Sequence, residues 1–140
     1  MAKNNKLNQW SLTLLRVTVG IIFIYHGYFK LFVSGGFNGT IDFLTQIGVP
    51  YPIYFALIVG VAEFFGGILL LIGLFTRLAS LVLITDMLVA FFKVHLKQGF
   101  FITPKTYGYE FVLLILATLF ALLIGGSGMI SVGRLFKRKR

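Results

Sequence analysis

Four long apolar stretches divide the chain, and they constrain its fold more than any other feature of the sequence. They cover residues 10–32, 52–75, 78–95 and 109–125. Each is close to the roughly 20 residues that a helix needs to cross a hydrocarbon core about 30 Å thick. The stretches are separated by turn-forming residues such as Ser34-Gly35-Gly36 and Thr103-Pro104. The pattern predicts an all-α fold, in which residues 1–140 form a single integral membrane four-helix bundle.

The composition excludes the ordinary soluble alternatives. Of the 140 residues, 58% are hydrophobic and only 12% are charged, and the mean hydropathy is +0.94. A soluble domain of this size leaves much of its chain exposed, so it could not hide so much apolar surface. The chain has no Cys. It therefore has no disulfide, thiolate metal site, iron–sulfur cluster or thiol-based redox chemistry of its own.

The net charge of +9 is best explained by membrane topology. If the N-terminus is cytoplasmic, nine basic residues fall on that side: Lys3, Lys6, Arg16, Arg77, Arg134, Lys137, Arg138, Lys139 and Arg140. Four fall on the other: Lys30, Lys93, Lys97 and Lys105. The positive-inside rule then predicts a multi-pass plasma-membrane protein with both termini in the cytoplasm. The basic tail, residues 134–140, is expected to lie on anionic lipid headgroups. No groove-reading motif accompanies it, so no nucleic-acid partner is predicted.

Charged residues within the apolar stretches are costly and usually mark function or pairing. Glu63 stands in the middle of the second stretch, and we interpret it as the candidate catalytic group, with a structural ion pair as the alternative. Arg16 and Lys30 share one helical stripe of the first stretch, and both are candidate ligand-binding residues. Two states stay open for Glu63: an ion pair with Arg16, or a neutral carboxyl in an apolar site. We expect a solvent-poor cavity that holds Glu63 within reach of Arg16 and His26.

The other candidates fall into two groups. His26, His95 and Glu110 join the ligand-binding residues, whereas Gly27, Gly67, Arg77 and Asp86 are assigned structural or topological roles. Glycines at helical spacing are typical of close helix packing, and a basic residue in a short turn is typical of topology. Asp86 and His95 are nine positions apart, so a regular helix would not turn both toward the bundle axis. No metal site is predicted from the two histidines.

Taken in order, these pieces resemble the DoxX family of small four-helix membrane proteins. The matching residues are Leu15-Arg16, Gly20, His26-Gly27, Lys30, Glu63, Gly66-Gly67, Gly73, Thr76-Arg77, Ala90, His95, Gly99-Phe100-Phe101, Glu110, Gly126-Ser127-Gly128 and Ser131. They span nearly the whole chain, from Leu15 to Ser131. The chain departs from the family at Ser131-Val132-Gly133, where Ser-Leu-Asp is frequent, and Asp86 is not part of the family pattern.

The resemblance implies the fold more directly than an activity. Some relatives are named for thiosulfate:quinone oxidoreductase subunits, whereas more distant ones are receptors or assembly chaperones. The resemblance favours a quinone-linked or redox-associated subunit that works with a partner oxidoreductase or as a homo-oligomer in the bilayer. No flavin, nucleotide or haem-attachment motif is present, so no intrinsic cofactor is predicted beyond a bound quinone. The alternatives are a noncatalytic assembly factor, carrier or small-molecule-binding module, or a transporter formed by paired copies, and enzyme activity stays open.

Overall fold

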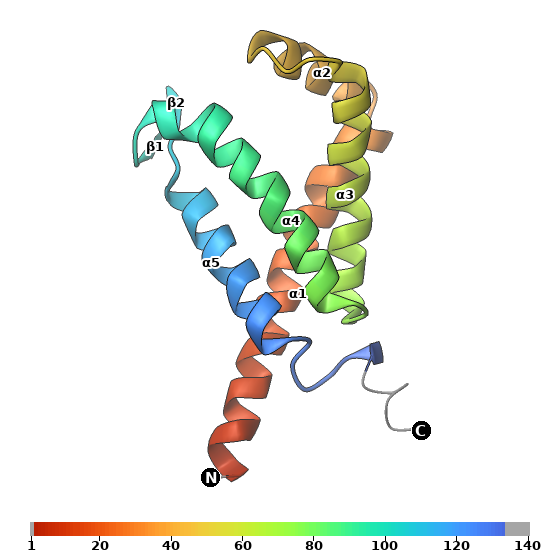
Figure 1. Cartoon of the computed structure of the whole chain (residues 1–140), viewed down its shortest axis with the longest axis vertical. Coiled ribbons are helices and arrows are strands. Elements are labelled where there is room, and N and C mark those ends of the chain that lie inside the picture. Colours follow the sequence, from red (N-terminus) through yellow and green to blue (C-terminus); the bar gives the residue numbers. More distant parts are fainter. Residues whose placement is uncertain (1, 134–140) are drawn as a thin grey trace.

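The computed structural model describes residues 2–133, which are mostly helical (Figure 1). The elements are α1 (Ala2–Phe32), α2 (Gly36–Gln46), α3 (Pro52–Ile72), α4 (Thr76–Ala90), the π-helix η1 (Phe91–His95), the 3₁₀ turn η2 (Leu96–Gln98), the antiparallel strands β1 (Ile102–Thr103) and β2 (Thr106–Tyr107), and α5 (Glu110–Gly125). The basic tail at 134–140 lies outside the described residues.

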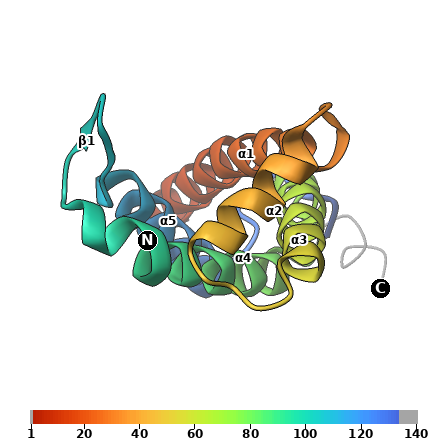
Figure 2. The same ribbon diagram turned by 90° about the horizontal axis from the view of Figure 1, so that it is seen from above.

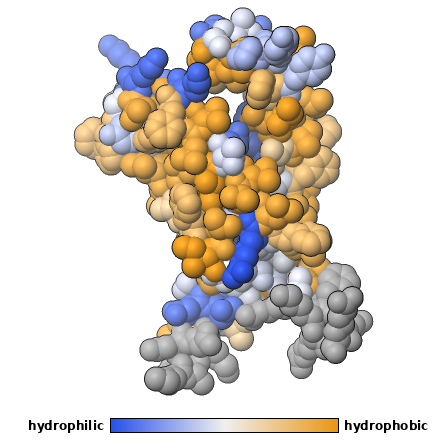
Figure 3. All heavy atoms as spheres, in the orientation of Figure 1, coloured by the Kyte–Doolittle hydropathy of each residue, from blue (hydrophilic) through white to orange (hydrophobic). Residues whose placement is uncertain are grey.

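Three helical segments are long and apolar enough to cross a membrane: Leu7–Phe32, Pro52–Ile72 and Thr76–Gln98. Figure 3 shows that apolar residues dominate the surface along the middle of the molecule. The fourth apolar helix, α5, has 16 residues, which gives it a length of only about 24 Å. The prediction of a helical membrane protein is therefore confirmed as far as three candidate spans. The short hairpin β1–β2 departs from an all-α fold, and the fourth span and the side of the termini stay predictions.

Helices α1 and α3 form the most extensive contact in the fold, and glycines lie at its centre. A Cβ atom on Gly67 would lie 2.6 Å from the backbone nitrogen of Ile24, and one on Gly20 would lie 2.9 Å from that of Leu71. A Cβ on Gly27 would overlap the backbone of Phe64. Side chains are absent where the two backbones meet, so the antiparallel helices approach closely.

The second pair, α4 and α5, supplies most of the apolar core. Leu83 of α4 and Leu119 and Leu122 of α5 are fully buried, together with Leu70 of α3. Figure 1 shows that the two pairs lie close at the lower end of the bundle and diverge toward the end that carries α2 and the hairpin. Seen from that end, α2 lies across the helices like a cap (Figure 2). The divergence leaves room for a cavity beneath α2.

Candidate functional site

A cavity of about 380 Å³ lies between the helices at the end of the bundle that carries α2 and the hairpin. All five α-helices, η1 and β2 contribute to its wall, which is mostly apolar and includes Phe23, Met87 and Ile115. Figure 3 shows the molecule hollowed beneath this cap. Small-molecule sites have volumes of about 300–1,000 Å³, apolar walls and a few polar groups that fix orientation. This cavity has the size and composition of such a site.

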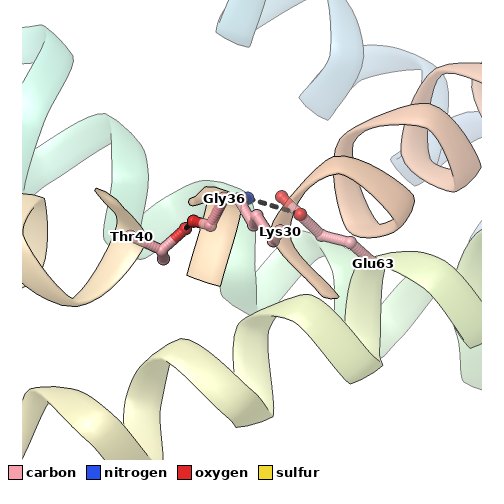
Figure 4. A network of polar contacts seen from close by, with 4 residues as sticks. All are labelled: Lys30, Gly36, Thr40 and Glu63. Carbon is pink, nitrogen blue, oxygen red and sulfur yellow. Dashed lines mark hydrogen bonds and ion pairs between the residues drawn. The ribbon is translucent and has the colours of Figure 1, made fainter. Parts of the chain in front are cut away.

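An ion pair between α1 and α3 is the main polar feature of the cavity wall. The Nζ of Lys30 donates a hydrogen bond to the Oε2 of Glu63, as Figure 4 shows. The Glu63 side chain is only 4% exposed, and that of Lys30 is 22% exposed. Gly60 leaves space for the neighbouring side chain of Leu31, because a Cβ there would lie 2.7 Å from the Leu31 Cδ2. Both charges are therefore held at the cavity, and the pair is largely removed from water.

The expected pair between Arg16 and Glu63 is not formed. Arg16 lies 14 residues before Lys30, or roughly 21 Å along a helix, and it is buried beside Gly73 at the other end of α3. Its Nη2 donates a 2.7 Å hydrogen bond to the carbonyl oxygen of Ile130. Arg16 thus fastens the segment after α5 onto α1, and the structure does not bring it to the cavity.

Three further predicted residues line the cavity: His26 at an exposed position, and Asp86 and His95 on the α4–η1 wall. Asp86 and His95 share this wall because the chain forms a π-helix at Phe91–His95. A π turn contains one residue more than an α turn, which rotates the following side chains by about 100°. The helix is therefore not regular between Asp86 and His95, so the condition under which the two side chains would face apart is not met.

The hydrogen bonds of these two residues differ. His95 Nδ1 lies 2.6 Å from the carbonyl oxygen of Tyr107. A carbonyl oxygen only accepts, so Nδ1 carries the hydrogen, and in the neutral ring Nε2 is an acceptor. The Asp86 Oδ2 atom is buried and has no hydrogen-bond partner in the described part of the chain. On the α4–η1 wall, the Nε2 of a neutral His95 is therefore an acceptor, whereas the Asp86 Oδ2 atom is enclosed by the protein.

The remaining predicted residues lie outside the cavity wall. Glu110 accepts a 2.8 Å hydrogen bond from the backbone nitrogen of Ile102 through Oε1, and so orders the hairpin. Arg77 donates a 3.1 Å hydrogen bond to the carbonyl oxygen of Ile124, which joins the start of α4 to the end of α5. The predicted packing glycines, Gly27 and Gly67, lie in the α1–α3 contact.

Two cavity residues with ionisable side chains, Lys93 and Tyr107, were not among the predicted site residues. Lys93 lies seven positions after Asp86, and this helical spacing was a signal that could have found it. Tyr107 belongs to the hairpin, where an exposed aromatic residue gives no signal in the sequence. Within residues 2–133, no group of three or more His, Asp or Glu side chains is placed to hold a metal ion.

Comparisons with known proteins place the chain in one family and find relatives that it matches over nearly their whole length. The DoxX family model matches residues 11–96. A Bacillus subtilis (strain 168) protein named "Putative oxidoreductase CatD" is 34% identical over 137 residues, covering 97% of this chain and 95% of the relative. An "Uncharacterized protein" of Haemophilus influenzae (strain ATCC 51907 / DSM 11121 / KW20 / Rd) is 32% identical over 140 residues, covering 96% of each chain.

A shorter match is found with the "Inner membrane protein YphA" of Escherichia coli (strain K12). It is 38% identical over 66 residues, covering 47% of this chain and 45% of that protein. No solved structure matches the chain. The range that the family model matches includes three cavity residues, Lys30, Glu63 and His95.

Proposed function

The chain belongs to the DoxX family of membrane proteins, and from this premise we propose that it is a redox-associated subunit whose cavity binds a quinone-type molecule. The observation that carries the proposal is the Lys30–Glu63 pair in the wall of an otherwise apolar cavity. The apolar wall suits the ring and the tail of a quinone. An ammonium group has three donors, so Lys30 can bond to Glu63 and to a quinone carbonyl oxygen at the same time. The relative named as an oxidoreductase supports a redox role.

The roles of the residues follow from their positions. Lys30 orients the ligand through a charge-assisted hydrogen bond. Glu63 holds Lys30 in place. As the carboxylate of this pair, it takes up one of the two protons that leave the ligand when the ring is oxidised and returns that proton when the ring is reduced, and the other proton is exchanged with water. The electrons come from a partner oxidoreductase, because the chain has no cysteine and no cofactor motif of its own. The protein is thus the quinone-binding member of a membrane assembly.

Filling the cavity tests this proposal without changing a charge. Ala90 lines the cavity, and Ala117 of α5 is exposed on the outside of the bundle. We expect Ala90→Phe to weaken binding of 2,3-dimethoxy-5-methyl-1,4-benzoquinone at least tenfold, while Ala117→Phe leaves it unchanged. Calorimetric titration of the full chain in detergent measures both, and mass spectrometry of its lipid extract should detect a co-purified quinone. Wild-type protein that neither binds the probe nor carries a quinone would refute the proposal.

We further propose that α5 completes four spans and that both termini are cytoplasmic, as the charge distribution indicates. The cavity then opens toward the outer face of the plasma membrane. Asn38→Cys and Lys105→Cys, both at exposed positions, should react with a membrane-impermeant maleimide in intact cells. A cysteine added after Arg140 should react only after permeabilisation. The test is clean because the chain has no cysteine, and labelling of the C-terminal cysteine in intact cells would reverse the assignment.

A further inference from the structure

A slot between α3 and α4 opens the cavity at the side of the bundle. Near the short turn that joins the two helices, Gly66 of α3 packs against Leu83 of α4, because a Cβ on Gly66 would lie 3.2 Å from the Leu83 Cγ. Beyond this contact the helices diverge (Figure 1), and Figure 3, in the same orientation, shows the surface hollowed between them beneath α2. The cavity is therefore not closed along this side.

Cavity residues form both sides of the slot. Glu63 and Asp86 lie three residues beyond the Gly66–Leu83 contact on their helices, and Val59 and Val89 lie about one turn further. The Val89 side chain is 54% exposed although it lines the cavity. A residue that both lines a cavity and is exposed lies at its edge, so Val89 marks the rim of the slot on α4.

The slot faces hydrocarbon rather than water. Helix α3 has 21 residues, which gives it a length of roughly 32 Å, close to the thickness of a hydrocarbon core. Val59 is the eighth residue of α3, so it lies roughly 10 Å inside this span. The nearby residues Ile58, Val61 and Val82 are apolar and exposed, as expected of positions that contact lipid. A molecule that enters through the slot therefore comes from the bilayer.

We propose that the cavity takes its quinone from the bilayer through this slot, with the ring beside Lys30 and Glu63 and a hydrocarbon tail leaving between α3 and α4. This inference rests on the proposed function and adds the ligand class to it: a long-tailed, membrane-dissolved quinone rather than a short, water-soluble one. A cavity of about 380 Å³ is at the lower end of the range for small-molecule sites. The ring and the first part of a tail fill it, and the rest of a long tail continues outside.

The slot gives the tail a path without adding affinity of its own. Lipid surrounds an apolar chain as favourably as an apolar protein surface does, so no hydrophobic gain follows from moving the tail into the slot. The side chains at the rim must instead leave room for it. On the opposite side of the cavity, α1 contributes the exposed polar residue His26, which suits a hydrocarbon tail less well than Val59 and Val89.

Photoaffinity labelling of the wild-type protein tests the path directly. The probe is 2,3-dimethoxy-5-methyl-1,4-benzoquinone with a decyl chain that ends in a diazirine, added to the full chain in phosphatidylcholine liposomes. After illumination, mass spectrometry maps the adducts, with and without an excess of the same decyl quinone lacking the diazirine. We expect the adducts that the competitor removes to lie on α3 and α4 beside the slot. Competed adducts on α1 or α5, or adducts that the competitor does not reduce, would overturn the proposed path.

Narrowing the slot gives a second, independent measurement. Val89→Trp places a large side chain at the rim, and Val82→Trp is the matched control, because Val82 lies seven residues earlier on the same helix, is exposed and is outside the cavity wall. Calorimetric titration in one detergent gives the affinity for the decyl quinone relative to that for the tail-less quinone. Partition of the tail into micelles is the same for every variant and cancels in the comparison. We expect this ratio to fall about tenfold in Val89→Trp through overpacking and to stay at the wild-type value in Val82→Trp.

The outcomes separate this inference from the function on which it rests. An unchanged ratio in Val89→Trp, or an equal fall in Val82→Trp, would overturn the slot and leave the quinone site standing, provided that the wild-type protein binds the tail-less quinone. Failure of the wild-type protein to bind either quinone would overturn both. The labelling experiment needs no variant, so the inference stays testable even if Val89→Trp fails to fold.

Discussion

Glu63→Leu is expected to lower the free energy of unfolding by about 3 kcal/mol, because it leaves Lys30 as a charge without a partner in the cavity wall. Removing one member of a buried ion pair typically costs about 3–5 kcal/mol. The lower end of that range applies here, since Lys30 is 22% exposed and keeps some access to water. Glu63→Gln should behave differently. Its amide oxygen can still accept from Lys30, so we expect the fold to survive and quinone binding to be lost or strongly weakened.

The double variant Lys30→Met/Glu63→Leu is the control for the first of these effects. Replacing both charges with apolar side chains removes the unpaired ion, and such replacements are often neutral for stability. We therefore expect the double variant to recover most of the stability that Glu63→Leu loses, as measured by thermal unfolding in detergent and a double-mutant cycle. Unchanged stability and ligand binding in Glu63→Leu would show that the pair neither holds the fold nor belongs to the site.

Helical spans were predictable because hydropathy is read along the chain and needs no knowledge of tertiary contacts. Each of the four apolar stretches contains a helix in the structure, although α1 starts earlier than its stretch and α5 is shorter than a typical span. The π-helix at Phe91–His95 was not predictable. The sequence there continues an ordinary helical pattern, and the inserted residue changes which side chains share a face.

Some of the cavity residues could be predicted from the sequence, but the ion pair that two of them form could not. Both members of the ion pair were candidates because charged residues in an apolar stretch stand out. The error concerned the register of two antiparallel helices. Gly27 contacts Phe64 and Arg16 lies beside Gly73, which puts Lys30 near Glu63 and Arg16 far from it. Hydropathy gives the depth of each residue only loosely, whereas the register is set by the glycine contacts between α1 and α3.

Gly67→Ala should then destabilise the protein, although alanine is the better helix former by about 1 kcal/mol. The added Cβ would lie 2.6 Å from the backbone nitrogen of Ile24 and 2.8 Å from the carbonyl oxygen of Gly20. Both atoms belong to the backbone of α1, so they cannot move aside as the end of a flexible side chain could. Overpacking of this kind typically costs about 1–3 kcal/mol, and we expect a loss near the upper end, with a larger loss for Gly67→Leu.

Gly39→Ala is the matched substitution for this prediction. Gly39 lies within α2, and a Cβ added there meets no atom within 4 Å. In this case the helix propensity of alanine acts alone, so the free energy of unfolding should rise by about 0.4–1 kcal/mol. Thermal unfolding of the two variants in the same detergent should therefore give shifts of opposite sign. Gly67→Ala should also disturb the candidate site, because a substitution that separates α1 from α3 also separates Lys30 from Glu63. If Gly67→Ala were as stable as Gly39→Ala, the close α1–α3 contact would be disproved, and with it the register that brings this ion pair to the cavity.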